Sequence, residues 1–358
     1  RVEIPKDNGK MRLLGIPTVV DRVVQQAINQ ALTPIYENQF SKTSYGFRPR
    51  RECHDALRGA QRIINEGYKY VVDLDLERFF DTVSHSKLIE ILSRTIKDGR
   101  VVSLIHKYLR SGVMNKGLFE ASEEGTPQGG PLSPLLSNIM LNELDKELER
   151  RGLPFVRYAD DSMIFCKSKR AAMRVKESIT RFIENTLYLK VNKEKTVVSY
   201  VRGVKYLGYS FYVMKGKCQL TVHPKSKAKM KSKLKELTSR SNGWGYAKRK
   251  QKLKEYIRGW VGYYHLANMK RLLLETDEWL RRRIRMCIWK AWKKAKTKVA
   301  NLIRCGINKY QAYEWGNTRK GYWRIADSPI LKRAIDNNKL RSAGYATLME
   351  VYLEWHPK

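Results

Sequence analysis

The stretch that most constrains this chain is residues 155–166, where two adjacent acids, Asp160 and Asp161, lie between two apolar runs. The flanking runs, 155–156 and 163–166, are β-prone, so the pattern predicts a strand, a tight turn bearing the acids, and a second strand. Two neighbouring carboxylates repel each other, which is costly unless a cation lies between them. A divalent metal ion is the usual solution, and its other ligands should lie elsewhere in the chain.

A second acidic strand is predicted at residues 68–76, where Asp73 and Asp75 alternate with apolar residues. Because side chains alternate across a strand, both aspartates lie on one face. Two-metal sites bring carboxylates together from separate strands, and Mg²⁺ prefers oxygen ligands. Asp75 therefore joins Asp160 and Asp161 as a candidate ligand. Asp73 is either a rival for one of these roles or a supporting acid.

The order of the remaining patterns predicts an α+β sandwich with helices on one face of a sheet. A hairpin is expected over residues 2–17, followed by a helix that begins near Thr18 and ends at Pro34. Further helices are expected at 56–67, 84–92, 101–110, 135–151 and 169–187. A hairpin edge is predicted at 113–120, a strand near 197–200 and a strand pair at 204–211.

The part of the chain after Pro224 is predicted to be helical and strongly basic. Helices are expected at 226–239, 248–265 and 269–298, with a small helical module at 299–358. The whole chain has 71 Lys and Arg against 35 Asp and Glu, a formal net charge of +36. Roughly 25 of the basic residues, against about 5 acids, fall within 216–300, which predicts a nucleic-acid-binding part. Aromatic residues interleaved with these charges favour that prediction over a merely solvated face.

The cysteines and the apolar runs indicate the cellular compartment in which the protein works. The five cysteines include no C-x-x-C pair, so neither a zinc ribbon nor a disulfide framework is predicted. Reduced thiols and the lack of a membrane-length apolar run favour a cytoplasmic protein; the resemblance described below implies the bacterial cytosol. Because the chain opens at Arg1 inside a patterned segment, we expect preceding residues to be missing.

Several motifs, in the right order, resemble those of reverse transcriptases. Residues 75–81 (Asp-Leu-Glu-Arg-Phe-Phe-Asp), 125–134 (Gly-Thr-Pro-Gln-Gly-Gly-Pro-Leu-Ser-Pro) and 158–161 (Tyr-Ala-Asp-Asp) resemble motifs A, B and C. Residues 4–22 and 44–49 resemble the fingers blocks of group II intron reverse transcriptases, 189–196 resembles motif D, and 205–211 resembles the primer grip. Residues 259–264 and 279–294 are similar to the maturase (X) domain. Over nearly its whole length the chain resembles bacterial class IIC intron-encoded proteins.

The resemblance implies a right-hand polymerase followed by an all-α region. Fingers would cover 1–68, the palm with motifs A to E 69–215, the thumb/maturase (X) domain 216–298, and a helical DNA-binding (D-like) module 299–358. The implied activity is an RNA-directed DNA polymerase that binds its intron RNA to assist splicing and supports retrohoming by target-primed reverse transcription. The expected cofactor is a pair of Mg²⁺ ions, for which Mn²⁺ can substitute. Expected partners are group II intron RNA, an RNA template with a DNA primer, target DNA and dNTPs, with no membrane and the oligomeric state left open.

The resemblance also implies roles for individual residues. Asp75, Asp160 and Asp161 would be the catalytic metal ligands, with the Leu76 carbonyl as an additional ligand. The implied nucleotide site comprises Lys6, Arg12, Arg78, Phe79, Phe80, Gln128, Gly129 and Lys195.

Within that nucleotide site the implied roles differ. Lys6 and Arg12 would grip the triphosphate, which Arg78 would assist through its backbone amide. Phe80 would lie under the sugar and reject a 2′-hydroxyl, whereas Phe79 is expected in the core. Gln128 would contact the nucleotide, and the glycine after it, Gly129, would allow close backbone approach. Lys195 is either the general acid for pyrophosphate or a plain surface lysine.

A set of basic residues is predicted to contact RNA: Arg48, Lys248, Arg249, Lys250, Arg258, Arg281, Arg282, Arg283 and Arg285. For Arg283 and Arg285 the alternative is that they hold their helix against an acidic partner.

Other activities stay open. One is an RNA-binding splicing maturase with a vestigial polymerase. Another is a retron, diversity-generating or defence-associated reverse transcriptase. Because the chain ends without cysteine pairs, we expect it to lack the zinc-bound His-Asn-His nuclease that some intron proteins carry.

Overall fold

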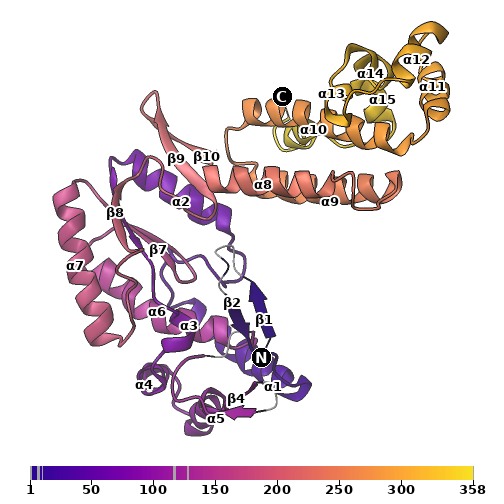
Figure 1. The fold of residues 1–358 in the computed structure, drawn as a ribbon. Helices are drawn as coiled ribbons and strands as arrows, with labels where there is room; N and C mark the ends of the chain where they lie inside the picture. The colour runs from indigo at the N-terminus through magenta and orange to yellow at the C-terminus, as the bar shows by residue number, and fades with distance from the viewer. Residues whose placement is uncertain (1, 6–8, 10, 116–117, 127–128, 358) are drawn as a thin grey trace. The chain divides into compact units, whose positions relative to one another are not determined.

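The computed structural model describes residues 2–5, 9, 11–115, 118–126 and 129–357, and the chain forms two compact units (Figure 1). Residues 1–207 with 211–218 make the first, here the sheet unit, and residues 208–210 with 219–358 make the second, the helical unit. The division falls within a two-stranded sheet of β9 (Tyr209–Met214) and β10 (Lys217–Val222).

A four-stranded antiparallel sheet is the centre of the sheet unit, with the strand order β6–β7–β3–β8. Its strands are β6 (Phe155–Tyr158), β7 (Asp161–Cys166), β3 (Tyr70–Leu74) and β8 (Val197–Tyr200). Val71 and Val72 of the central strand are almost fully buried. β-Branched side chains pack well on such a pleated surface, which is why this apolar run forms the middle of the sheet.

Helices supply the rest of this core: α1 (Val19–Glu37), α2 (Cys53–Asn65), α3 (Phe79–Thr82), α4 (His85–Thr95), α5 (Gly99–Arg110), α6 (Ser133–Arg150) and α7 (Lys169–Thr186). Helix α7 packs against β3, β7 and β8, and the apolar residues of α4 and α6 join the same buried cluster. Two hairpins complete the unit, β1 (Val2–Pro5) with β2 (Met11–Leu14) and β4 (Val113–Asn115) with β5 (Leu118–Glu120).

In the helical unit, α10 packs against α8, α13 and α16. The helices are α8 (Pro224–Leu237), α9 (Tyr246–Tyr264), α10 (Lys270–Ala291), α11 (Ala295–Arg304), α12 (Lys309–Gly316), α13 (Tyr322–Ile325), α14 (Pro329–Ala334), α15 (Asn337–Ser342) and α16 (Leu348–Glu354). The buried carboxylate of Asp277 accepts hydrogen bonds from the backbone amides of Leu348 and Met349 at 2.9 and 3.0 Å. These bonds satisfy the first amides of α16 and fix this last helix to α10.

Three predictions of element boundaries were wrong. Helix α1 continues through Pro34 to Glu37, because Leu32 and Tyr36 on the same helix are buried in the core, and that packing outweighs the hydrogen bond lost at proline. Residues 204–208 do not form a strand, since Leu207 and Gly208 make a turn with φ angles of 48° and 82°. The helix expected over 269–298 breaks at Trp292 (ψ 64°), whose ring packs against that of Trp289.

None of the described helices is both long and apolar enough to cross a membrane.

Candidate active site

The predicted acids lie at the ends of two adjacent strands. In the β3–β7 register, Asp73 pairs with Met163 and Leu74 with Ser162, so continuing the register sets Asp75 beside Asp161. Asp161 begins β7 opposite Tyr158, which leaves Ala159 and Asp160 as the turn between β6 and β7. The structure thus brings Asp75, Asp160 and Asp161 together, although they are distant in the sequence.

The carboxylates lie close enough to repel one another. Burial, followed by Asp160 and Asp75, raises the pKa of Asp161 to about 6, against the opposing effect of Lys205 and Lys195. Burial, followed by Asp161 and Asp75, raises the pKa of Asp73 to about 6 as well. Burial and the neighbouring carboxylates both disfavour the charged form of each aspartate. This site accumulates negative charge that favours a cation.

The backbone of Asp75 is held by the segment between α7 and β8. The hydroxyl of Thr196 accepts a hydrogen bond from the Asp75 amide at 3.2 Å and donates to its carbonyl at 3.3 Å. The Asn192 amide donates to the same carbonyl at 2.9 Å. The Lys195 ammonium lies 3.3 Å from both carboxylate oxygens of Asp75. Lys195 is therefore at the acids, where it offsets part of their charge.

The turn bearing Asp160 is supported by a buried arginine. Arg157 is fully buried and donates to both carboxylate oxygens of Asp145, at 2.8 and 3.1 Å from Nε and at 2.5 Å from Nη2. Its Nη1 donates to Asn138 and to the carbonyl of Ala159, each at 2.9 Å. Burial raises the pKa of Asp145, and Arg157 acts against that rise. Such a bidentate pair is rigid, so the residue before Asp160 has a fixed position.

A second support for the turn comes from the loop 43–46. The amide of Tyr45 donates to the carbonyl of Arg157 at 2.8 Å, and the amide of Arg157 donates to Thr43 at 3.0 Å. A Cβ atom on Gly46 would lie 2.1 Å from the amide nitrogen of Ala159, so only glycine fits there. Neither this contact nor Arg157 was predicted. The Arg within an apolar strand was the available signal for Arg157.

The loop that follows residue 125 is tied to the helices beside the acids. His85 donates from Nε2 to the carbonyl of Gly125 at 2.7 Å, and the Thr126 amide donates to Phe80 at 2.6 Å. Beyond the loop, Gly129 has φ +114°, and a Cβ there would lie 2.3 Å from the carbonyl oxygen of Gly15. Gly129 therefore allows a close approach to the backbone of Gly15, and its approach to a nucleotide stays a prediction.

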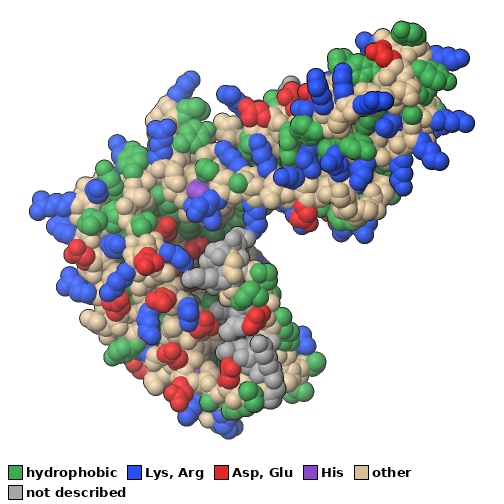
Figure 2. Space-filling model, in the orientation of Figure 1, with side chains coloured by type: hydrophobic (Ala, Val, Ile, Leu, Met, Phe, Trp, Pro, Cys, Tyr) green, Lys and Arg blue, Asp and Glu red, His purple; other side chains and the backbone are tan. Residues whose placement is uncertain are grey.

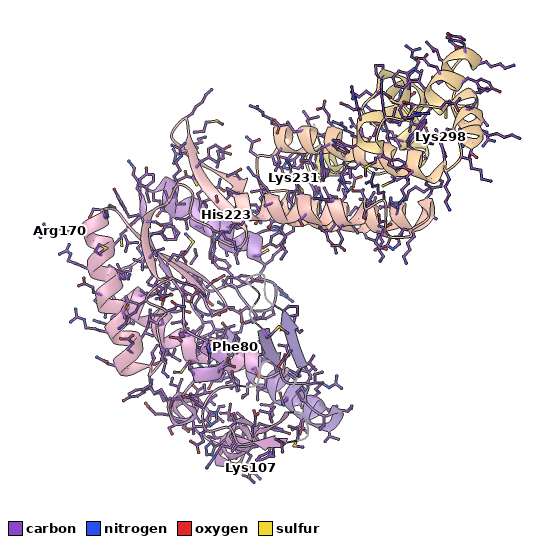
Figure 3. The ribbon with its side chains drawn as sticks, in the orientation of Figure 1. Phe80, Lys107, Arg170, His223, Lys231 and Lys298 are labelled. Atoms are coloured by element: carbon purple, nitrogen blue, oxygen red, sulfur yellow. The ribbon has the colours of Figure 1, made fainter. Side chains whose placement is uncertain are left out.

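The structure describes some of the other predicted nucleotide-site residues and not others. Lys6 and Gln128 lie outside the described residues, as does the side chain of Arg12. Phe79 is buried, as expected for a core residue, while Phe80 (labelled in Figure 3) is half-buried and meets Phe79 edge to face. Arg78 is exposed and precedes α3 with a left-handed φ of 46°. The side chain of Leu76 is buried, and its backbone forms an antiparallel β-bridge with Val191.

As the described residues stand, no three His, Cys, Asp or Glu side chains are arranged to enclose a metal ion. The chemistry of the donor set nevertheless fits a hard divalent cation, because the converging groups are carboxylates whose repulsion a cation would relieve. The acids are crowded together without forming a coordination shell.

The predicted RNA-contacting arginines divide into interior and surface residues. The guanidinium of Arg48 is buried against Glu37 at 2.7 Å. Arg249 is buried beside Asn242, and Arg285 is buried with its Nε donating to Ile335 at 2.8 Å. Arg283 donates to Thr238 and Lys235. These four make hydrogen bonds or an ion pair within the fold, and their contact with RNA stays a prediction.

The remaining residues of that set stay at the surface. Arg258 is exposed, and Lys248 lies 5.4 Å from the ring centre of Trp244. Lys250 donates to Ala343, Arg282 pairs with Asp327 at 3.3 Å, and Arg281 is half-exposed. On the face shown in Figure 2, Lys and Arg side chains cover much of the helical unit.

Carboxylates that meet at the ends of adjacent strands, beside a glycine-rich loop, are typical of metal-dependent nucleotidyl transfer. Residues 4–211 match the reverse transcriptase (RNA-dependent DNA polymerase) family, and residues 227–306 match the maturase-specific domain of group II introns. The chain therefore belongs to the reverse transcriptase family, among its members with a group II intron maturase domain. Membership implies dependence on divalent metal ions.

The chain is also similar to individual proteins of known sequence or structure. Protein YkfC of Escherichia coli (strain K12) is 37% identical over 248 residues, covering 58% of this chain and 65% of that protein. Group II intron-encoded protein LtrA of Lactococcus lactis subsp. cremoris is 33% identical over 279 residues, covering 60% of this chain and 46% of LtrA. The chain thus spans about half to two thirds of these relatives' length. The structure of apo telomerase from Candida Tropicalis has a TM-score of 0.47 at 13% identity, covering 94% of this chain and 55% of that one.

Proposed function

We propose that this chain is an RNA-directed DNA polymerase that also binds group II intron RNA to assist splicing and supports retrohoming by target-primed reverse transcription. The observation that carries the polymerase activity is the convergence of Asp75, Asp160 and Asp161 from adjacent strands, where burial, followed by the charges of Asp160 and Asp75, raises the pKa of Asp161 to about 6. The domains would be the fingers at 1–68, the palm at 69–215, the thumb and maturase domain at 216–298 and a DNA-binding module at 299–358.

The three aspartates would hold two Mg²⁺ ions, with the Leu76 carbonyl as an additional ligand. Such ions, when bound, would lower the pKa of the primer 3′-hydroxyl and stabilise the leaving pyrophosphate. The part played by the chain is positioning. Arg157 fixes the carbonyl of Ala159 at 2.9 Å, and Thr196 with Asn192 fixes the backbone of Asp75. Preorganised groups of this kind need little rearrangement during the reaction.

The incoming dNTP would bind next to Phe80 and the 125–129 loop. The half-buried ring of Phe80 is suited to exclude a ribose 2′-hydroxyl, and the His85 bond to Gly125 keeps the start of the loop in place. Lys195, beside Asp75, has an ammonium group that can neutralise or protonate the leaving pyrophosphate. Lys6, Arg12, Gln128 and the Arg78 amide are proposed to contact the triphosphate and base.

Primer extension on an RNA template tests the polymerase. Asp160→Asn and Asp75→Asn should each lower the extension rate at least about 100-fold, because each removes a charge that the transition state needs. The matched control is Glu66→Gln, which neutralises an exposed acid of the sheet unit and should leave the rate unchanged. Normal extension by either aspartate variant would refute the proposed active site.

The two activities separate in one further assay. Intron splicing assisted by the Asp160→Asn protein should proceed as with the original chain, because RNA binding does not need the carboxylate. If splicing assistance disappears together with extension while the variant remains folded, the proposed independence of the two activities is wrong.

A further inference from the structure

A hollow of about 670 Å³ in the helical unit has the chemistry of a nucleotide site that the polymerase does not use. It lies among α8, the residues that follow α8, α10 and α13. Basic, hydroxyl and apolar groups share its lining, which includes Lys235, Ser239, Arg240, Arg283, Met286 and Trp323. Its volume is in the range of pockets that hold small organic ligands.

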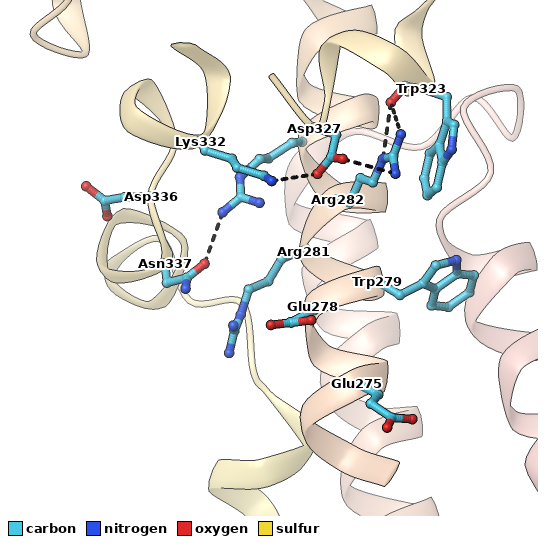
Figure 4. Close-up of a pocket in the computed structure, with 11 residues that line it drawn as sticks. Glu275, Glu278, Trp279, Arg281, Arg282, Trp323, Asp327, Lys332, Asp336 and Asn337 are labelled. Carbon is cyan, nitrogen blue, oxygen red and sulfur yellow. Dashed lines mark hydrogen bonds and ion pairs between the residues drawn. The ribbon is translucent and has the colours of Figure 1, made fainter. Parts of the chain in front are cut away.

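The indole of Trp323 forms one wall of this hollow and is 38% exposed. The Arg282 guanidinium lies 3.9 Å from the ring centre, and its Nε and Nη2 donate to the Trp323 carbonyl at 3.2 and 3.0 Å. Arg282 is itself held by Asp327, which Lys332 also contacts at 2.8 Å (Figure 4). One face of the indole is thus covered by a fixed cation, and the ring is held rigidly at the rim of the hollow.

The charge of the hollow is positive. Lys235 and Arg240 are exposed, and Arg240 lies 5.1 Å from the ring centre of Tyr322. Arg283 is anchored through Thr238 at 2.6 Å. The acid in the lining, Glu236, is paired with Lys233 at 2.7 Å. Lys235 and Arg240 are therefore left to attract an anion, whereas the hydrogen bonds of Arg283 hold it within the fold.

We propose that this hollow binds one unpaired nucleotide of a single-stranded RNA, with its base stacked on Trp323 and its phosphate beside Arg240 and Lys235. An aromatic face next to unneutralised basic groups is the pairing that recognises a base and its phosphate together. A base within a duplex is already stacked on its neighbours and cannot reach the indole. The inference rests on the proposed RNA-binding function and names a site for it.

RNA is favoured over DNA because Lys235, Arg240 and Arg283 all fall within residues 227–306, which match the intron maturase domain. Trp323 lies outside that segment, so this chain completes the hollow with a residue from α13.

Equilibrium binding of the full chain to a short oligoadenylate and to a duplex RNA of equal length tests the site. Trp323→Leu keeps apolar volume but removes the stacking surface, so it should weaken oligoadenylate binding about tenfold and duplex binding less than about twofold. Trp323→Phe should restore most of the single-strand affinity. Tyr310→Leu, which removes an 84% exposed aromatic on α12 away from the hollow lining, should change neither.

Arg240→Gln is the independent variant if Trp323→Leu fails to fold. It should reduce the salt dependence of oligoadenylate binding by about one phosphate contact. Equal losses on both RNAs, or no loss from Trp323→Leu and none from Arg240→Gln, would overturn the site while leaving RNA binding intact. A larger loss on single-stranded DNA than on oligoadenylate would also overturn it. Lack of any RNA binding by the original chain would instead overturn the proposed function itself.

Discussion

The pKa of Asp161 is raised to about 6 by burial and by the carboxylates of Asp160 and Asp75, so ionising this group works against the folded state. A carboxyl group with its ordinary pKa of 3.8 releases its proton at lower pH when the chain is unfolded. Between these values the folded state binds more protons than the unfolded state. The stability contributed by Asp161 is therefore present at low pH and is lost as the pH rises from about 4 to about 6.

Asp161→Asn should thus stabilise the sheet unit of chelator-treated protein at pH 7.5 and have little effect at pH 4. Because Asp161 reaches solvent, screening limits the gain to the order of 1 kcal/mol. That gain corresponds to about 2–4 °C in the thermal transition. Melting curves at both pH values measure the difference, with Glu66→Gln as the control. An equal shift at both pH values would show that repulsion at Asp161 is not the cause.

At this scale the sequence was sufficient for the acids and insufficient for their supports. Asp75, Asp160 and Asp161 stand out because charged residues interrupt apolar strands. Arg157 interrupts a strand in the same way, but its partner Asp145 lies on α6, where an acid in an amphipathic helix suggests a solvent-facing side chain. Thr196 falls within the segment that resembles motif D, but its role was not predicted, because a hydroxyl that binds the backbone of Asp75 has no sequence pattern.

The β6–β7 hairpin is the element on which the site depends, and its turn is packed from outside by the loop 43–46. Gly46 is the point of closest approach, with no room for a Cβ against Ala159. The Gly46 carbonyl also accepts a hydrogen bond from Asn138 of α6 at 2.8 Å, so the loop cannot simply move away. The turn and the loop therefore form one rigid assembly.

Gly46→Ala should cost about 1–3 kcal/mol of stability, as for other overpacked sites. It should also lower primer extension about 100-fold, because a displacement of the order of 1 Å at a reacting group has that effect. Gly99→Ala is the matched control, since its Cβ would meet open space at the start of α5. Unfolding by urea and single-turnover extension measure the two effects. Full activity of the Gly46→Ala protein would mean that the loop does not hold the turn.

Elements were predicted well where a periodic pattern ended in a cap, and poorly where packing overrode a local rule. Thr18 and Ser84 cap α1 and α4 as the pattern indicated. Pro34 did not end α1, because burying Tyr36 in the core stabilises one more turn of the helix. The parallel bridge between Ser44 and Arg157 was unpredictable, since it joins a loop to a strand far along the chain.

Over the whole molecule, the excess positive charge is a property of particular exposed side chains. The exposed or half-exposed residues Lys248, Arg258 and Arg281 make no ion pair with an acid among the described residues, unlike Arg48 and Arg282. Counting charges along the sequence could not separate these groups, because burial is decided by the fold. The net charge therefore predicted a nucleic-acid partner, but it did not predict which residues would contact it.

Replacing Lys248, Arg258 and Arg281 by Gln should reduce the slope of log affinity for RNA against log salt by up to about 3, roughly one for each lost phosphate contact. Arg285→Gln is the contrasting variant. It leaves the buried carbonyl of Ile335 without its donor and should cost about 1–3 kcal/mol of stability with little change in slope. Binding titrations over a range of salt concentrations provide the slopes. An unchanged slope in the triple variant would place the RNA contact on another surface.

The strand order β6–β7–β3–β8 also governs how the chain reaches its native state. The central strand β3 pairs with β7 and β8, which follow it by roughly 90 and 125 residues, so its contacts are of high sequence separation and slow to form. During synthesis both edges of the strand that contains Val71 and Val72 stay unpaired until β7 leaves the ribosome, and one edge stays unpaired until β8 does. A nascent chain that stops before residue 200 lacks the strand that completes this sheet, and is prone to aggregate.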